Sequence, residues 1–235
     1  MTIRTIKAAL LISAITIFGS CNRVKYVHTD SYVMYYSIYD GINIDTSILR
    51  TYESPSGWRK IRQEIHVKMR NIHKNVSWES EGEDYDLYQD LCEKYNDVSY
   101  DRKVQLFIPP GTVLGVGSAI YPDWVSISVT CDSDFDASHP AGSELNDIME
   151  CEYQSSFLYI KGGYKDERLT WVKIKPLNEI TADDLCLLCS PAVGSPMTIY
   201  FTAKPEIQDK KQISVTVMTN EGNIYTDSCV FDFSL

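Results

Sequence analysis

The sequence is poor in histidine and lacks the short motifs that identify common enzyme classes. Its four histidines are His28, His66, His73 and His139, and none stands in the His-Glu-x-x-His pattern of zinc proteases. No Gly-x-Ser-x-Gly segment offers the nucleophile elbow of a serine hydrolase. The 32 acidic residues offer too many pairs of carboxylates to single out a general acid or base. We therefore expect surface histidines, identify no catalytic residue, and favour a protein that is not an enzyme.

An excess of basic residues is also absent. Lys and Arg total 22 against 32 Asp and Glu, which gives a formal net charge of −10. Residues 1–20 hold two of the basic side chains and no acidic one, so a chain without this segment carries −12. Phosphate backbones and anionic lipids repel a protein of this charge. Nucleic acid is therefore excluded as the expected ligand, and any attachment to a membrane should not depend on charge.

No apolar run reaches the roughly 20 residues that a helix needs to cross a bilayer. The run Ala8–Phe18 has 11 residues, follows two basic side chains and precedes two small residues and Cys21. This order is typical of a secretory signal peptide, and a cysteine directly after the small pair resembles a bacterial lipoprotein signal. We expect removal of residues 1–20, lipidation of Cys21, and a short tether over residues 21–31. An uncleaved anchor is the alternative.

Six cysteines follow Cys21, and their state is left open by the sequence. They are Cys92, Cys131, Cys151, Cys186, Cys189 and Cys229. An exported chain can pair them in 15 ways, but most lie in apolar or alternating segments, where a free cysteine packs like a small hydrophobic residue. Cys186 and Cys189 have the spacing of redox and zinc motifs, yet the two leucines between them predict burial, and no second pair completes a zinc site.

Sixteen tyrosines and several alternating segments favour β-sheet. Val125, Ile127, Val129 and Cys131 alternate with Ser and Thr, which is the pattern of a half-buried strand. Further strands are expected at 32–39, 104–108, 156–160, 169–174, 197–203, 212–219 and 223–233, with a hairpin turn at 220–222. Residues 58–72 fit a helix or a strand, and the alternation over 64–70 favours a strand. A loop is expected at 45–57, and short helices at 86–94 and near 181–185.

These elements predict a mostly β fold, an antiparallel β-sandwich of immunoglobulin-like or related topology with one or two short helices. Residues 32–235 are expected to form a single domain. Within it, residues 40–100 are either an elaboration of the sandwich or a small subdomain. The tyrosines of residues 32–39 divide between the two faces of the expected strand, so one face could present aromatic rings to a ligand, although tyrosine in a sheet is more often core.

An acidic run directly after the expected strand 124–131 is the one candidate for a metal site. Asp132, Asp134 and Asp136 alternate along a loop, and calcium takes oxygen ligands of this kind. The calcium-loop pattern of EF-hands fails, because Ala137 and Ser143 occupy the positions that need Gly and Glu. A weak calcium site and a solvated acidic loop are the two readings. No other cofactor is indicated.

The lipoprotein signal, the stretch 126–136, the segment 141–147 behind it and the final hairpin together resemble uncharacterised lipoproteins of Bacteroides-type gut bacteria. The resemblance covers about a third of the chain and implies no activity. It implies an outer-membrane anchor, and the basic residues Arg23 and Lys25 after Cys21 favour a periplasm-facing position over surface display. We expect a non-enzymatic module that binds a protein or a glycan. The alternatives are an envelope hydrolase that uses paired carboxylates and a fimbria-associated structural subunit.

Overall fold

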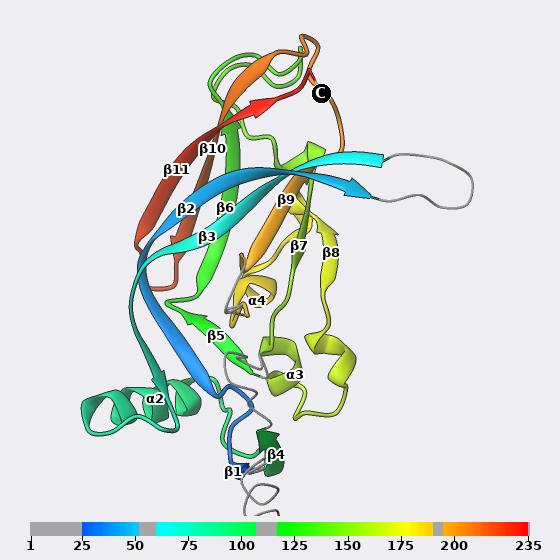
Figure 1. Ribbon diagram of the computed structural model, residues 1–235. Coiled ribbons are helices and arrows are strands. Elements are labelled where there is room, and N and C mark those ends of the chain that lie inside the picture. Colours follow the sequence, from blue (N-terminus) through cyan, green and yellow to red (C-terminus); the bar gives the residue numbers. More distant parts are fainter. Residues whose placement is uncertain (1–24, 52–59, 107–116, 190–194, 235) are drawn as a thin grey trace, which may run out of the picture.

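The computed structural model describes residues 25–51, 60–106, 117–189 and 195–234. The fold is mostly β, with three short α-helices in this part of the chain. Two long, curved strands cross the molecule and connect its parts (Figure 1). Within the described residues, no helix is long and apolar enough to cross a membrane.

The larger sheet has six strands in the order β5-β2-β3-β9-β7-β8. Their bounds are β2 Tyr35–Thr51, β3 Lys60–Ser77, β5 Ser118–Tyr121, β7 Met149–Tyr153, β8 Lys173–Pro176 and β9 Met197–Phe201. Strand β5 pairs with the first residues of β2, whereas β9 pairs with β3 near Ile65–Val67. The short strands therefore attach at different heights of the β2–β3 ladder, and the sheet curls strongly between them (Figure 1).

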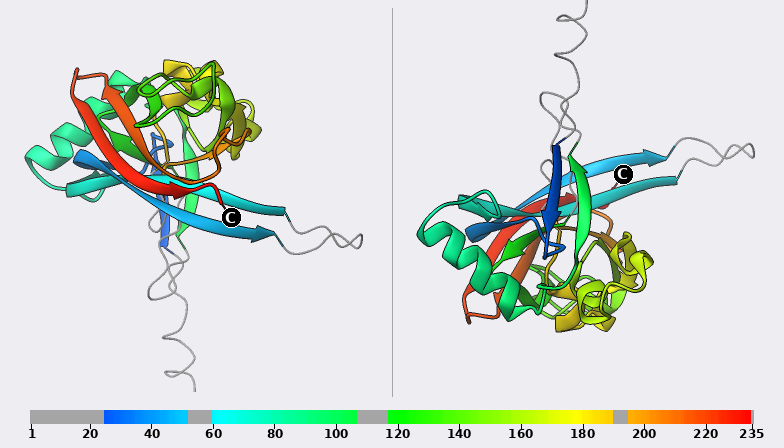
Figure 2. Two further views of the ribbon diagram at one scale, coloured as in Figure 1. Left: turned by 90° about the horizontal axis from the view of Figure 1, so that it is seen from above. Right: turned by 90° about the horizontal axis from the view of Figure 1, so that it is seen from below.

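The second sheet has three strands in the order β11-β10-β6, and β1 and β4 form a separate two-stranded ribbon. Their bounds are β1 Lys25–Thr29, β4 Arg102–Leu106, β6 Trp124–Cys131, β10 Lys210–Thr219 and β11 Ile224–Asp232. On the exposed face of the β10–β11 hairpin, Ser214 bonds Ser228 and Thr216 bonds Thr226 across the strands. The β2–β3 hairpin extends sideways beyond these sheets (Figure 2).

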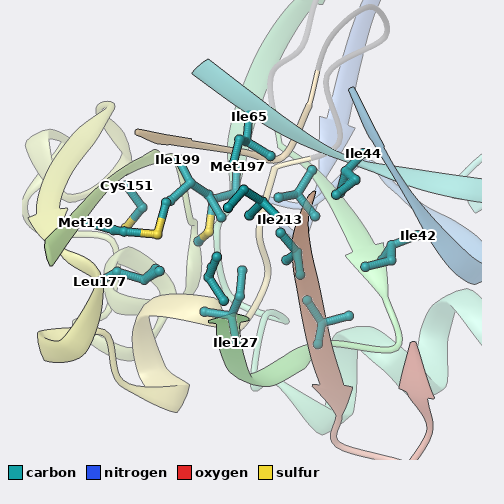
Figure 3. Packing of buried hydrophobic residues seen from close by; sticks show 14 of the residues in the cluster. Ile42, Ile44, Ile65, Ile127, Met149, Cys151, Leu177, Met197, Ile199 and Ile213 are labelled. Carbon is teal, nitrogen blue, oxygen red and sulfur yellow. The ribbon is translucent and has the colours of Figure 1, made fainter. Parts of the chain in front are cut away.

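The main hydrophobic core takes side chains from both larger sheets. Ile42, Ile65 and Ile199 come from the six-stranded sheet, and Ile127 and Ile213 come from the three-stranded sheet (Figure 3). All five are almost fully buried. The alternation of these strands follows the core, since β10 buries every second residue from Lys211 to Thr219.

A second hydrophobic cluster lies where helix α2 (Glu83–Lys94) packs against the end of β3. Tyr88, Leu91 and Cys92 are the buried face of this helix. They meet Tyr36 of β2 and Val76 of β3. The β2–β3 ladder thus contributes to both clusters, and helix α2 covers one end of it.

Two further short helices complete the described chain, α3 (Phe157–Lys161) and α4 (Ala182–Leu185), together with single 3-10 turns η1 (Asn146–Ile148), η2 (Glu167–Thr170) and η3 (Leu177–Glu179). Helix α4 begins with a capping box, in which the Thr181 hydroxyl accepts from the Asp184 backbone and the Asp184 carboxylate accepts from the Thr181 backbone. The capping signal that predicted this helix is confirmed.

Several expected elements are confirmed within one to three residues at most ends. The strand predicted at 124–131 is β6, the choice of a strand for 64–70 is correct, and the hairpin turn at 220–222 joins β10 to β11. The mostly β class is therefore confirmed. The immunoglobulin-like sandwich is a finer statement and stays a prediction.

Other expectations are wrong. The strand expected at 156–160 is absent, because helix α3 begins at Phe157, directly after Ser156. The strand expected at 169–174 begins only at Lys173, after the 3-10 turn η2. The loop expected from Asp45 does not begin there, because β2 continues to Thr51. The larger sheet is not wholly antiparallel, since β2 and β5 are parallel. The described residues alone contain three α-helices, where one or two were expected. Strand β1 lies within residues 21–31, and the tether predicted there stays a prediction.

Candidate functional site

A hollow of about 300 Å³ lies between helix α2, the turn that precedes it and the residues that follow β1. Trp78, Tyr85 and Tyr88 supply aromatic rings to its lining. Asp30 and Glu93 supply carboxylates. Aromatic and acidic side chains thus meet in one concave patch, on segments that are far apart in the sequence.

Helix α2 places three polar side chains along one side of this hollow. Tyr85, Gln89 and Glu93 are spaced by four residues and therefore share one stripe of the helix. The Gln89 amide donates to the Tyr85 hydroxyl at 2.7 Å, which holds the exposed ring beside the helix. The helix begins after Gly82, whose φ of 57° suits glycine. Acidic residues in its first turn stabilise the helix by interacting with the positive end of the helix dipole.

The floor of the hollow is neutral and hydrogen-bonded. The Tyr88 hydroxyl donates to the Val33 carbonyl at 2.8 Å and lies 2.6 Å from the Ser31 hydroxyl. Burial raises the pKa of Tyr88 well above its usual value and raises the pKa of Cys92 to about 11. Both groups are therefore uncharged at neutral pH, and Cys92 is a packed thiol without the thiolate character of a nucleophile.

Asp97 lines the same hollow and fixes the adjoining chain. Its carboxylate accepts from the backbone N–H groups of Tyr32 at 2.7 Å and Val33 at 2.8 Å, and from the Tyr164 hydroxyl at 2.8 Å. The side chain is fully buried, and burial raises its pKa, while the three hydrogen bonds act in the opposite direction. Asp97 thereby holds the segment after β1 against the end of α2.

One polar atom of the hollow has no partner of its own. The Thr29 hydroxyl is buried, lines the hollow, and is one of four buried side-chain polar atoms without a hydrogen-bond partner in the described part of the chain. An unpaired buried hydroxyl costs roughly 1–3 kcal/mol. The atom has almost no accessible surface, so a ligand would reach it only if neighbouring side chains moved.

The structure does not bring the predicted calcium residues together as a metal site. Asp132 accepts from the Gln212 backbone at 3.2 Å, Asp134 from the Ala141 backbone at 2.8 Å, and Asp136 from the Ser138 backbone at 2.8 Å. No group of three His, Cys, Asp or Glu residues suited to a metal occurs among the residues that the structure describes. Calcium binding stays a prediction, and the loop geometry accounts for all three carboxylates without a cation.

His139 is the residue that the sequence reading undervalued. Its Nδ1 lies 2.8 Å from an Asp136 oxygen and its Nε2 lies 3.1 Å from an Asp147 oxygen, so two carboxylates hold the ring. The carboxylates raise the pKa of His139, chiefly through Asp136. The side chain is only 11% exposed, and the expectation of a surface histidine is wrong here. In the sequence, the spacing of Asp136 and His139, three residues apart, was the signal that could have indicated this contact.

The tyrosines of residues 32–39 do not form an exposed aromatic face. Tyr36 and Tyr39 are buried in the two clusters, and Tyr32 packs edge-on against Tyr100 and Tyr159. The core alternative is therefore confirmed for Tyr36 and Tyr39. The rings that line the hollow come instead from the turn at Trp78 and from α2.

The cysteines after Cys21 are free thiols in the structure, although the sequence left disulfides open. The burial predicted between Cys186 and Cys189 is confirmed, because Leu187 and Leu188 are fully buried. Burial raises the pKa of Cys189 to about 11, which disfavours a reactive thiolate. Cys21, the predicted lipidation site, lies outside the described residues.

Comparison with known protein families, with curated proteins and with solved structures finds no match to this chain. The resemblance to Bacteroides-type lipoproteins therefore stays a prediction, and the arguments about function that follow depend on the geometry of the chain itself.

Proposed function

We propose that the protein is a lipid-anchored binding protein of the cell envelope, and that the hollow beside α2 binds a glycan. One observation carries this proposal: Trp78 and Tyr85 meet carboxylates and an amide in a single concavity. The proposal does not include a reaction.

The chemistry of a sugar ring matches this lining. The ring presents an apolar face of C–H groups, which packs on an aromatic side chain, and an edge of hydroxyls, which need hydrogen-bond partners. Trp78 and Tyr85 provide rings, while Gln89 and Glu93 provide polar groups within the same hollow. A volume of about 300 Å³ is at the low end of ligand sites, so one terminal sugar unit fits better than a long segment.

Charge narrows the class of glycan. Asp30, Glu93 and the chain as a whole are acidic, and no Lys or Arg belongs to the described lining of the hollow. A uronic acid or a sulfated sugar would be repelled. We therefore propose a neutral oligosaccharide or one that carries an amine.

The proposal for location and scaffold follows the sequence. Lipidation of Cys21 would hold the domain at the outer membrane, facing the periplasm, with surface display as the alternative. We also propose that the domain is a distorted relative of the β-sandwich, because the six-stranded and three-stranded sheets contribute to one core. A Bacteroides-type lipoprotein with this scaffold fits a role in binding.

A binding screen with neutral, amino and acidic oligosaccharides tests the proposal, followed by calorimetric titration of the best ligand. We expect binding of a neutral or amino glycan by the wild-type protein. Replacement of a stacking ring removes a contact of about 0.5–1.5 kcal/mol beyond its buried area, so Trp78→Ala and Tyr85→Ala should each weaken binding by roughly tenfold.

Matched variants separate the site from general effects. Trp171 is 62% exposed and is not among the residues that line the hollow, so Trp171→Ala should bind like the wild type. Because Trp78 is half-buried and packs on the second cluster, Tyr85→Ala, at a more exposed position, guards against a loss caused by unfolding. Absence of binding to every glycan class, or equal binding by the Tyr85→Ala protein, would overturn the proposal.

A further inference from the structure

Strand β8 ends the strand order of the larger sheet, and its side chains are arranged in the reverse of the usual pattern (Figure 1). Its register pairs Lys173 with Tyr153 of β7, which is buried in the main core. It also pairs Lys175 with the buried Cys151. Because paired residues of an antiparallel ladder share a face, both lysines lie on the core side. Ile174, between them, lies on the outer face and is 59% exposed.

Contacts on the core side hold β8 in this orientation. The Lys175 ammonium donates to the Asp184 carboxylate at 2.8 Å, and Asp184 is buried. The Lys173 ammonium is also buried and lies 5.7 Å from the centroid of the Tyr153 ring. If β8 were turned so that Ile174 faced the core, the buried carboxylate would lose its cation, which is costly. The apolar face of β8 therefore stays outside.

Three large apolar side chains gather at this outer surface. Trp171 is 62% exposed, Val172 58% and Ile174 59%. We call these three residues the β8 patch. No other four consecutive residues in the described part of the chain hold three exposed large apolar side chains. A concentration of this kind indicates an interaction surface, because single exposed apolar residues are normal on a protein and clustered ones are not.

The charges beside the β8 patch balance one another. Residues 165–168 are two basic and two acidic residues in the order Lys-Asp-Glu-Arg. Within them, the Arg168 guanidinium donates to both oxygens of Asp166 at 2.8 Å. Lys161 pairs with Asp183 at 2.7 Å. The patch thus has a border of balanced charge, although the chain as a whole carries −10.

We propose that the β8 patch joins two copies of this chain in a two-fold symmetric dimer. In such a dimer the same surface meets itself, so the surface must be complementary to itself. An apolar centre beside equal numbers of both charges meets this requirement. A basic or acidic partner, or an anionic membrane, would instead be matched by an excess of one charge. Two copies of an acidic chain also repel each other least where their facing surfaces are neutral.

Trp171 is the expected anchor of this dimer, because tryptophan is enriched among the residues that dominate binding at interface centres. A hollow of about 140 Å³ lies beside Val172 and can receive an apolar side chain of the second copy. Three apolar residues with a charged border are fewer than the roughly 20–30 residues that each partner supplies to a standard interface. We therefore expect a dimer that dissociates in the micromolar range.

Sedimentation velocity of the purified full chain, from about 1 μM to about 1 mM, tests the proposal. All proteins carry Cys21→Ala, so that neither a lipid nor a disulfide at this residue can join two chains. We expect monomers and dimers in equilibrium. Ile174→Asp and Trp171→Asp place a charge at exposed positions, so each should keep the circular dichroism spectrum and raise the midpoint concentration at least tenfold. Ile207→Asp is the matched control, since Ile207 is 68% exposed and outside the patch, and it should dimerise like the parent protein.

Exchange of the charges beside the patch tests whether it meets itself. Lys165→Glu combined with Arg168→Glu makes all four residues 165–168 acidic, and Asp166→Lys combined with Glu167→Lys makes all four basic. Each double variant alone should stay monomeric, and an equimolar mixture should form dimers. A parent protein that is monomeric throughout, polymers larger than a dimer, dimers undiminished by Ile174→Asp, or a mixture that stays monomeric would each contradict the proposal. The patch shares no residue with the hollow beside α2, so glycan binding and dimerisation can fail independently.

Discussion

Replacement of the buried Asp97 by asparagine should destabilise the protein by about 2 kcal/mol. Two backbone N–H groups, of Tyr32 and Val33, donate to different oxygens of this carboxylate, and the Tyr164 hydroxyl shares one of them. An amide keeps only one oxygen, so one backbone N–H would face an NH₂ group. An unpaired buried donor costs roughly 1–3 kcal/mol. The relief of a buried charge offsets a part of this cost, because burial raises the pKa of Asp97.

Urea unfolding followed by circular dichroism measures this difference. The exposed Asp90→Asn on α2 is the matched control and should change stability by less than about 0.5 kcal/mol. For a chain of this size, a loss of 2 kcal/mol corresponds to a fall of roughly 4–8 °C in Tm. Stability of Asp97→Asn equal to that of Asp90→Asn would refute the account of Asp97 as the anchor of this segment.

The pH dependence gives an independent check on Asp97. Its folded pKa lies above the unfolded value near 3.9, so the native state binds more protons between these two pKa values. The contribution of Asp97 to stability is therefore greatest below about pH 3.9 and falls as pH rises through the folded pKa. The advantage of the wild type over Asp97→Asn should shrink as pH rises above about 3.9. An advantage that grows as pH rises would contradict the direction of the shift.

Three further changes probe other parts of the molecule. Phe135 is fully buried and stacks on Phe201 with ring centroids 5.4 Å apart, so Phe135→Ala should cost about 3–5 kcal/mol in urea unfolding, and a cost below 1 kcal/mol would contradict its role in the core. The pKa of His139 is raised in the folded state, so its stabilising effect is complete below about pH 6.5 and disappears as pH rises through the folded pKa. The free energies of unfolding of the wild type and His139→Gln should therefore differ most below about pH 6.5 and least at high pH. The reverse order would refute the stabilisation of His139 by its two carboxylates. Cys21→Ala should move the protein from the membrane to the soluble fraction on cell fractionation, whereas a protein that stays with the membrane would refute the lipid anchor.

Local pattern explains which strands could be predicted. Trp124–Cys131 alternates over its whole length, and the structure buries one face of it as that pattern requires. Strand β7, Met149–Tyr153, also alternates, with Met149, Cys151 and Tyr153 buried. It was not predicted, because it is short and two of its five residues are glutamates. At 156–160 the apolar run is too short to distinguish a strand from a helix, and helix α3 forms there.

The first strand was expected to end at Tyr39, but β2 continues to Thr51. Asp40 and Gly41 are common in turns, yet both lie inside this strand, where Gly41 packs close to the Arg70 side chain. The continued alternation at Ile42 and Ile44, both buried, was the better signal. The long pairing of β2 with β3 outweighs the turn propensity of Asp40 and Gly41. This pairing cannot be recognised from the sequence alone.

The candidate sites could not be predicted for a different reason. The hollow beside α2 joins Thr29, Trp78 and Glu93, which only tertiary packing brings together. The acidic loop was visible in the sequence, but the direction of each carboxylate was not. Phe135 within that loop is buried in the core and fixes the loop to it. The carboxylates of Asp134 and Asp136 accept hydrogen bonds from backbone N–H groups of the same loop.

If Cys21 carries a lipid and the hollow beside α2 binds a glycan, as proposed, the position of strand β1 limits where the two can meet. Thr29 ends this strand and also lines the hollow beside α2, only eight residues after Cys21. Even a fully extended chain of that length spans no more than about 29 Å. With a lipid on Cys21, the entrance to the hollow would stay within a thin layer next to the bilayer. Such a protein would sample saccharides at the membrane face and would not reach those dispersed through the depth of the periplasm.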